Sequence, residues 1–144
     1  MNLEIRPAAE SDLDEIIALL DSDSLIGNPR GREDYLRSFR EIAAHADNQV
    51  IVAVLDARVA GVLQLTFIPG LRQAWRAQVE NVRVRAELRS QGIGAKLMEW
   101  VIAQARQRGC GLVQLTTNVA RHDARRFYTR LGFQPSHVGM KLYL

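Results

Sequence analysis

The sequence predicts an α+β fold, in which one mixed sheet carries helices on both faces. Three observations favour this class. Strand-like segments occur near both ends and in the middle of the chain, and segments with apolar residues at helical spacing lie between them. The chain has 144 residues, of which 47% are hydrophobic, and this length suits a single domain spanning residues 1–144.

The first quarter of the chain predicts a strand and two helices. Residues 2–6 alternate as a strand would, and Pro7 ends them. Ser11 is the expected N-cap of a helix whose apolar residues recur every three or four positions. The Ser-, Asp- and Gly-rich residues 22–31 predict a loop, and Arg32 to Ala46 predicts a second helix.

Three strand predictions follow in the middle of the chain. Gln49 to Leu55 is a β-branched run, Asp56-Ala57 is the expected turn, and Val59 to Ile68 is the returning arm of a hairpin. Pro69-Gly70 ends this arm, and Val79 to Arg85 predicts a third strand.

The remaining sequence alternates between helix and strand. Ile93 to Arg108 is strongly amphipathic, and Gly109 is suited to the position after its end. Leu112 to Thr117 predicts a strand. A short helix is expected from Ala124 to Leu131, capped by Asp123 and closed by Gly132, before a last strand from His137 to Leu144. The predicted order is therefore β-α-α-β-β-β-α-β-α-β.

Composition excludes several classes of protein. Cys110 is the only cysteine, so an intramolecular disulfide is impossible and a reducing cytoplasm is the expected location. Neither a signal peptide nor a membrane span is expected. The net charge of +3 comes from arginines interleaved with acids, which does not favour nucleic-acid binding. The three dispersed histidines do not predict a metal site.

The most informative segment is the turn between the strand at Val79 and the helix at Ile93. Gly92 and Gly94 would allow a phosphate to approach the backbone at a helix N-terminus, where unpaired N–H groups favour an anion. Arg89 adds a positive charge. A Walker A loop and a Rossmann fingerprint both fail to match. The alternative is that the glycines only form a tight turn.

Two motifs then resemble the GCN5-related N-acetyltransferase (GNAT) family. Arg89 to Gly94 matches the family's acyl-CoA motif, Arg/Gln-x-x-Gly-x-Gly/Ala, and Asn118 is followed by a second signature at Phe127 to Phe133. The resemblance covers nearly the whole chain. It implies a mostly antiparallel mixed sheet, acetyl-CoA as the cosubstrate, and acetyl transfer to an amine.

The resemblance also implies which residues hold coenzyme A. The backbone of Val82 and Val84 would pair with the pantetheine arm as an added strand does, and Asn118 would bond the same arm. The pyrophosphate would bind the amides of the loop and helix start, namely Arg89, Ser90, Gln91, Gly92, Ile93, Gly94 and Ala95.

Two residues are candidates for the chemistry. An amine with a pKa near 10 must lose a proton before it attacks the thioester, and Glu80 is the candidate base, reached through water. Glucosamine-phosphate acetyltransferases carry a Glu-Asp pair where this chain has Glu80-Asn81. The alternative is an exposed glutamate paired with Arg83. Tyr128 is the candidate acid toward the thiolate, and the alternative is a packed tyrosine of the core.

The acceptor is the least determined part of the function. It is expected to bind between the first two helices, their loop, and residues 69–76. The stretch 118–128 with Ser136-His137 is similar to aminoalkylphosphonate acetyltransferases, and Arg30, Arg72, Arg76 and Arg121 would suit an anionic small-molecule amine. A neutral or peptide amine is the alternative. An inactive coenzyme A sensor and a nucleic-acid-binding protein are the rival functions, and a homodimer is left open.

Overall fold

The computed structural model describes residues 2–22 and 30–144, which form two compact units, Met1–Gln114 and Leu115–Leu144. Within these residues, no helix is long and apolar enough to cross a membrane. The elements of the first unit are β1 (Leu3–Pro7), α1 (Leu13–Asp21), α2 (Arg32–Ala43), β2 (Asn48–Leu55), β3 (Arg58–Ile68), β4 (Arg76–Val84) and α3 (Ile93–Gln107). The last residue of β5 (Leu112–Leu115) already belongs to the second unit.

The five strands form one sheet in the order β1-β2-β3-β4-β5. The β1–β2, β2–β3 and β3–β4 pairs are all antiparallel, as the family resemblance implied. The predicted hairpin turn is confirmed, since Asp56 and Ala57 have φ values of 50° and 65° at the tight connection between β2 and β3. Both values lie in the left-handed region that two-residue hairpin turns require.

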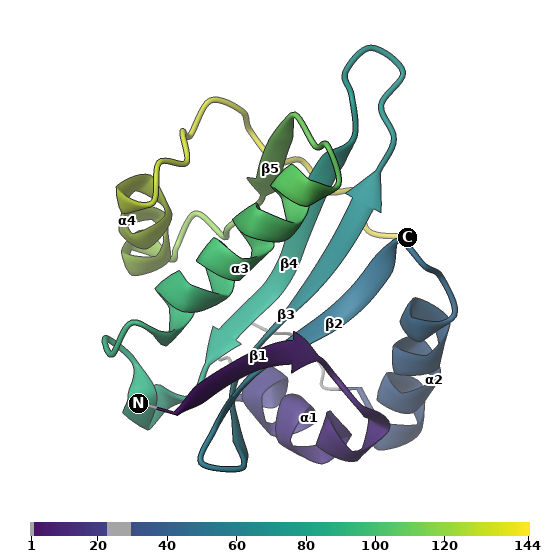
Figure 1. Cartoon of the computed structure of the whole chain (residues 1–144), viewed down its shortest axis with the longest axis vertical. Coiled ribbons are helices and arrows are strands. Elements are labelled where there is room, and N and C mark those ends of the chain that lie inside the picture. Colours follow the sequence, from purple (N-terminus) through teal and green to yellow (C-terminus); the bar gives the residue numbers. More distant parts are fainter. Residues whose placement is uncertain (1, 23–29) are drawn as a thin grey trace. The chain divides into compact units, whose positions relative to one another are not determined.

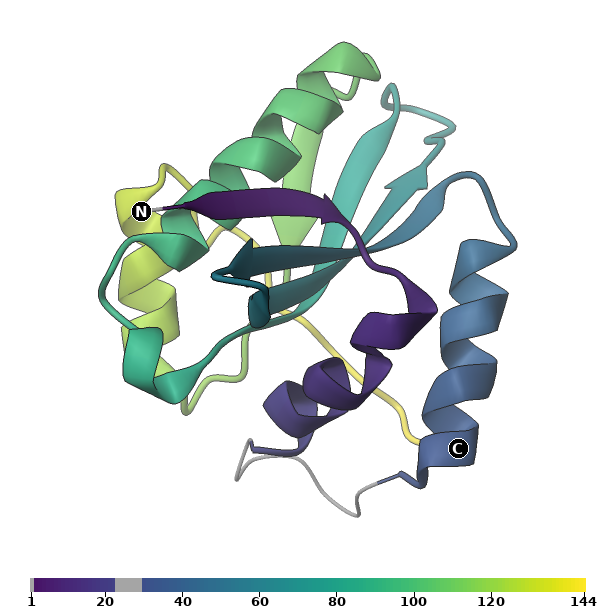
Figure 2. The same ribbon diagram turned by 60° about the horizontal axis from the view of Figure 1, so that its bottom comes forward.

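Helices cover both faces of this sheet, which confirms the predicted fold class. Figures 1 and 2 show α1 and α2 on one face and α3 on the other. On the α1 face, Ile16 and Leu19 pack with Val52, Val59 and Val62. The α3 face buries another group of large side chains, which includes Ile93, Leu97, Met98 and Val101. The sheet is therefore the shared middle layer of two apolar cores.

The start of α1 differs from the prediction in its capping residue. Ser11 does not cap the helix, because it lies within a 3₁₀ turn at Glu10–Asp12. The carboxylate of Asp12 instead accepts a hydrogen bond of 2.7 Å from the Ala9 amide and two from Arg6, at 2.8 and 3.2 Å. These bonds lower the pKa of Asp12, and the Arg6 hydrogen bond is the largest cause. A partly buried ion pair thus joins β1 to the start of α1.

Two predicted boundaries are close to the observed ones, and one prediction lies outside the described residues. The helix expected from Arg32 to Ala46 ends at Ala43, and β4 begins at Arg76, before the expected Val79. Such differences are common at the ends of helices and strands, where a few residues can belong either to the element or to the adjoining loop. Most of the loop expected at residues 22–31 lies outside the described part of the chain.

The second unit contains α4 (His122–Arg130) and an extended C-terminal segment. Asp123 is not the cap, because Arg121 precedes the first turn and Asp123 pairs with Arg126 inside the helix. Gly132, with φ of 101°, follows the helix end as expected. The predicted strand from His137 to Leu144 is wrong, since these residues form no strand in the structure. Alternating apolar and polar residues favour a strand, but a strand also needs a neighbouring strand to pair with.

Candidate acetyltransferase site

The strand β4 is interrupted at the position of the expected pantetheine contacts. Gln64 pairs with Glu80 and Val62 pairs with Arg83, so that two residues of β4 lie opposite the single residue Leu63 of β3. Asn81, the first of these two, has φ of 55°. Such a bulge breaks the regular ladder and leaves backbone groups unused by the sheet. The β4 backbone is therefore suited to pair with an extended ligand here.

Val82, the second bulge residue, already has one backbone interaction. Its carbonyl oxygen accepts a 2.7 Å hydrogen bond from Nη1 of Arg83. A carbonyl has two lone pairs, so this bond leaves one available for a ligand. Val84, two residues further, ends the strand.

The loop after β4 has the features of an anion site at the start of α3. A 3₁₀ turn at Ala86–Leu88 leads to Ser90 and Gly92, whose φ values are 65° and 84°. Gly92 is the N-cap residue of α3 and offers no side chain to the first amides of the helix. No atom lies within 4 Å of the Cβ that a larger residue would place there. An open helix N-terminus fits a phosphate group.

The other predicted phosphate ligands surround this N-terminus. Arg89, Ser90 and Gln91 are exposed, while Ile93 is fully buried in the core. The first turn of α3 contains no acidic residue that would repel an anion. The loop therefore supplies the positive charge of Arg89, and the helix start supplies unpaired backbone N–H groups. The buried Ile93 anchors this helix start in the core.

Gly61 of β3 was not identified as important from the sequence, although it fixes the position of α3. A Cβ atom at Gly61 would lie 2.9 Å from Cδ1 of Leu97 and 3.3 Å from the Arg83 carbonyl oxygen. A side chain here would push α3 away from the sheet. A glycine inside a β-branched strand was the available signal for such close packing.

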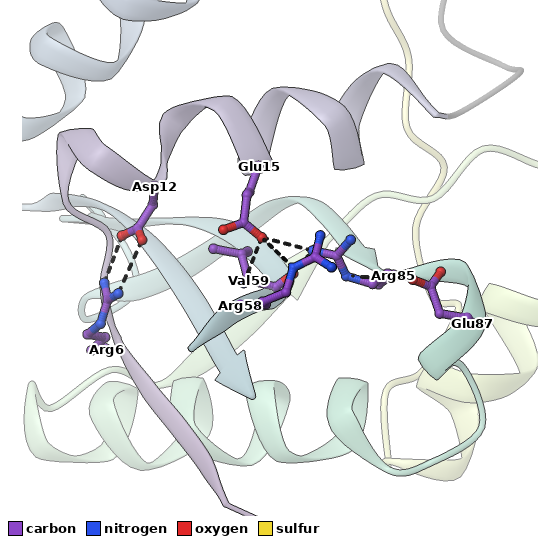
Figure 3. A network of polar contacts seen from close by, with 7 residues as sticks. All are labelled: Arg6, Asp12, Glu15, Arg58, Val59, Arg85 and Glu87. Atoms are coloured by element: carbon purple, nitrogen blue, oxygen red, sulfur yellow. Dashed lines mark hydrogen bonds and ion pairs between the residues drawn. The ribbon is translucent and has the colours of Figure 1, made fainter. Parts of the chain in front are cut away.

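Arg85 and Glu15 form a second support that the sequence analysis did not identify. The Glu15 carboxylate on α1 accepts a hydrogen bond of 3.0 Å from the Val59 amide and another of 3.0 Å from Nη2 of Arg85 (Figure 3). Arg85 also donates to the Val59 carbonyl oxygen and lies 3.9 Å from Glu87. These bonds fix the first residue of the cofactor loop to α1 and β3. Glu15 and Arg85 are 70 residues apart, so no local sequence pattern could predict their contact.

Glu80 lies on the same strand as the bulge. It is exposed and directly precedes Asn81. The first unit thus brings the candidate base, the pantetheine strand and the phosphate loop together along one continuous segment, from β4 to the start of α3. Water can reach an exposed carboxylate, as a proton relay requires.

Asn118 and Tyr128 belong to the second unit. The Asn118 side-chain oxygen accepts a 2.9 Å hydrogen bond from the Ala120 amide, which forms a local turn. Tyr128 is half-buried, and its ring packs edge-to-face with Phe127 at 5.0 Å and with Phe133 at 5.7 Å between centroids. These contacts fix the orientation of the Tyr128 ring. These contacts are compatible with both interpretations of Tyr128, as a catalytic acid and as a packed aromatic side chain.

The remaining reactive groups have ordinary roles. Burial raises the pKa of the Cys110 thiol, which keeps it protonated and unreactive at neutral pH. In the described residues, no three side chains of His, Cys, Asp or Glu gather as a metal site would require. Several arginines form ion pairs with nearby acids, among them Arg32 with Asp14 and Arg40 with Glu10.

Sequence comparison agrees with this geometry. The model of the acetyltransferase (GNAT) family matches residues 13–133, which include the bulge, the loop and the Tyr128 signature. The chain belongs to the GNAT family of acetyltransferases. It is an acyl-CoA-dependent N-acyltransferase, and acetyl-CoA is its cosubstrate.

Three relatives illustrate the similarity. The chain is 31% identical to an aminoalkylphosphonate N-acetyltransferase of Salmonella typhimurium, over 93% of this chain and 86% of the relative. It is also 31% identical to glucosamine 6-phosphate N-acetyltransferase 1 of Oryza sativa, over 96% of this chain and 86% of the relative. A crystal structure from Bacillus halodurans, described as a transcriptional regulator, is 41% identical with a TM-score of 0.93, covering 99% of this chain and 100% of that one.

Proposed function

We propose that this enzyme transfers the acetyl group of acetyl-CoA to the primary amine of a small anionic molecule, by direct attack within a ternary complex. One observation carries the proposal: an open helix N-terminus without a side-chain cap follows a bulged strand through a short loop. The first feature suits the pyrophosphate and the second suits the pantetheine arm. The thioester would then lie beside β4.

The cofactor residues can be tested through Arg89. Its exposed guanidinium would contribute charge to phosphate binding, so Arg89→Ala should weaken acetyl-CoA binding about tenfold, with a shallower dependence on salt. Arg106→Ala is the matched control, because it removes an exposed arginine from the opposite end of the same helix. Calorimetric titration of both variants would measure the difference. Equal affinities would remove Arg89 from the site.

The protonated amine first loses one proton through water to Glu80. The neutral nitrogen then forms a bond to the thioester carbonyl carbon and releases its second proton to water as the carbon–sulfur bond breaks. Tyr128 donates a proton to the departing sulfur and regains one from water. Glu80→Gln should lower kcat/KM about 100-fold near neutral pH and recover in part at alkaline pH, where more amine is neutral. A uniform loss at every pH would favour a structural role for Glu80.

The anionic acceptor rests on the chain's arginines and on its relatives. Two of the relatives are named for amines that carry a phosphonate or a phosphate. Arg72 and Arg76 lie within the predicted acceptor segment, residues 69–76, and Arg76 is the first residue of β4. Arg30 bonds Ser38 at 2.9 Å and the Asp34 carbonyl oxygen at 3.2 Å, so it would have to leave α2 to reach an acceptor.

A panel of amines tests the acceptor and the activity together. Thiol release from acetyl-CoA would be followed with 2-aminoethylphosphonate, its carboxylate analogue and uncharged ethylamine, at low and high salt. The phosphonate should give the highest kcat/KM at low salt, and its advantage should shrink as salt screens the charges. A better rate with ethylamine would end the anionic proposal, whereas no release with any amine would favour the coenzyme A sensor.

Nucleic-acid binding stays the weaker candidate. The relative described as a transcriptional regulator motivates a test of it. Against it, several arginines of the described chain form ion pairs with acids, as Arg37 does with Asp34. A duplex that bound with steep salt dependence would revive this candidate. The single domain and the cytoplasmic location also stay predictions.

A further inference from the structure

An ion pair that takes no part in the proposed reaction holds one end of the loop between β4 and α3. Arg85, the first residue after β4, donates from Nη2 to the Glu15 carboxylate of α1 at 3.0 Å and to the Val59 carbonyl oxygen of β3 (Figure 3). The Arg85 side chain is 19% exposed, whereas that of Arg58, which lies 3.7 Å from the same Glu15 oxygen, is 68% exposed. Water and salt screen the shielded pair less than the exposed one. Arg85 is therefore the more firmly held of the two arginines.

The pair also completes the hydrogen bonding of β3 where β4 has ended. Val84, the last residue of β4, pairs with Gly61, so Val59 lies beyond the end of that strand. The Val59 amide donates to Glu15 at 3.0 Å, and the Val59 carbonyl oxygen accepts from Arg85. Backbone groups in folded proteins usually need such partners. Because the two side chains satisfy both backbone groups of one residue, the pair joins α1, β3 and the loop in one arrangement.

The backbone of Arg85 extends this arrangement into the loop. The Arg85 amide donates to the Ala60 carbonyl oxygen at 2.8 Å, and the Arg85 carbonyl oxygen accepts from the Leu88 amide at 2.9 Å. The second bond closes the 3₁₀ turn at Ala86–Leu88, which leads directly to Arg89. A change in the direction of the chain at Arg85 would therefore move the loop residues that follow it.

We propose that the Glu15–Arg85 pair positions this loop for acetyl-CoA and couples α1 to cofactor binding, an inference that rests on the cofactor site of the proposed function. Neither side chain has to touch acetyl-CoA. The pair holds the loop in the conformation in which the amides at the start of α3 are open, so the ligand does not have to order the loop when it binds. A site that is ordered before binding loses less conformational entropy and binds more tightly. Glu15 and Arg85 are therefore positioning residues.

A purely electrostatic role of the pair predicts the opposite result for one variant. If the two residues acted only through their charges, Arg85 would attract the phosphates of acetyl-CoA and Glu15 would repel them. Glu15→Ala would then strengthen acetyl-CoA binding. In the positioning role, Glu15→Ala removes the group that holds both Arg85 and the Val59 amide, so binding weakens. The direction of the Glu15 effect therefore separates the two roles.

Calorimetric titration with acetyl-CoA measures the effect of the pair. Glu15→Ala and Arg85→Ala should each weaken binding about fivefold, and the double variant should lose no more than Arg85→Ala alone, because both residues act through one contact. Arg58→Ala is the matched control, because Arg58 approaches the same carboxylate from the first position of β3, outside the loop, and its affinity should not change. Equal or tighter binding by Glu15→Ala, or losses that add in the double variant, would overturn the proposal.

A second ion pair of α1 separates positioning from a general loss of stability. Asp12→Asn breaks the pair with Arg6, which joins the start of α1 to β1 and not to the loop, so this variant should keep its acetyl-CoA affinity. Arg85→Lys keeps the charge and should recover part of the affinity that Arg85→Ala loses. If Arg85→Ala does not fold, Glu15→Gln tests the same contact, because it keeps an acceptor for the Val59 amide and should still bind acetyl-CoA more weakly. Equal losses in Asp12→Asn and Glu15→Ala would show that the Glu15 pair is only structural.

Salt separates positioning by Glu15 from the direct charge of Arg89. Glu15→Ala should weaken acetyl-CoA binding by the same factor at low and high salt, whereas the loss in Arg89→Ala should shrink as salt screens the charge. A Glu15 effect that reverses or disappears at high salt would mean that charge and not position is responsible. The proposed function fails separately: an unmodified protein that binds no acetyl-CoA would overturn both proposals, whereas normal binding by the unmodified protein and by Glu15→Ala would overturn this inference alone.

Discussion

The two units of the chain differ most in what they bury. All the buried side chains of the described residues lie between Asp12 and Ala105, within the first unit. In Leu115–Leu144, every residue is half-buried or exposed, although the segment carries Asn118 and Tyr128. The unit with the candidate cofactor-binding residues therefore has its own buried core, whereas the unit with the candidate acid contains no buried side chain.

The largest effect is expected from the core of the first unit. Leu97 of α3 is fully buried, so Leu97→Ala should lower the free energy of unfolding by about 2–5 kcal/mol. Leu142→Ala should cost less than about 0.5 kcal/mol, because the Leu142 side chain is 87% exposed. Urea denaturation measures both losses. Losses of similar size in the two variants would contradict this contrast.

The second unit should show its importance in turnover more than in stability. Tyr128→Phe keeps the edge-to-face packing on Phe127 and Phe133 but removes the hydroxyl. We expect kcat to fall about 100-fold while the Kd of acetyl-CoA changes little, because the proposed role of the hydroxyl is to act on charge that develops only during the reaction. Unchanged turnover, measured by thiol release, would leave Tyr128 as a packed aromatic.

The contrast between the units also explains what the sequence could predict. The spacing of apolar residues and the positions of turn residues predicted the helices and strands of the first unit well, since its helices each bury one face against the sheet. The loop at Arg89 to Gly94 was visible because an anion site at a helix N-terminus is local in sequence. The bulge at Asn81 and the contact of Glu15 with Arg85 were not, because both depend on pairing between distant strands and helices. The last predicted strand is wrong for a related reason. Residues 137–144 alternate as a strand would, but alternation does not show whether a neighbouring strand is available, and they form no strand in the structure.

A smaller effect is expected at Gly61, where the first unit is most tightly packed. Gly61→Ala would place a methyl group 2.9 Å from Leu97 and should cost about 1–3 kcal/mol of stability. The displaced α3 should also bind acetyl-CoA more weakly. Gly111→Ala is the control, because no atom lies within 4 Å of its Cβ position. If both variants unfold at the same urea concentration, the close contact at Gly61 does not limit the position of α3.

The smallest effect is expected at Asp12, the buried charge of the first unit, and it should depend on pH. The hydrogen bond from Arg6 lowers the pKa of Asp12 in the folded protein below the value of about 3.9 in the unfolded chain. The ionised carboxylate therefore stabilises the fold fully above pH 4, and this contribution is lost as the pH falls through the folded pKa. Asp12→Asn should cost about 1 kcal/mol near pH 7, and the difference from the unmodified protein should shrink below pH 4.

The matched control for Asp12 lies in the second unit. Asp123 also pairs with an arginine, Arg126, but its side chain is 96% exposed, whereas that of Asp12 is 12% exposed. Water screens an exposed pair, so Asp123→Asn should cost less than Asp12→Asn near pH 7. Thermal unfolding of both variants between pH 3 and pH 8 would measure the two losses. An equal loss in both variants, or a loss at Asp12 that persists unchanged at pH 3, would show that burial does not strengthen the Arg6–Asp12 pair.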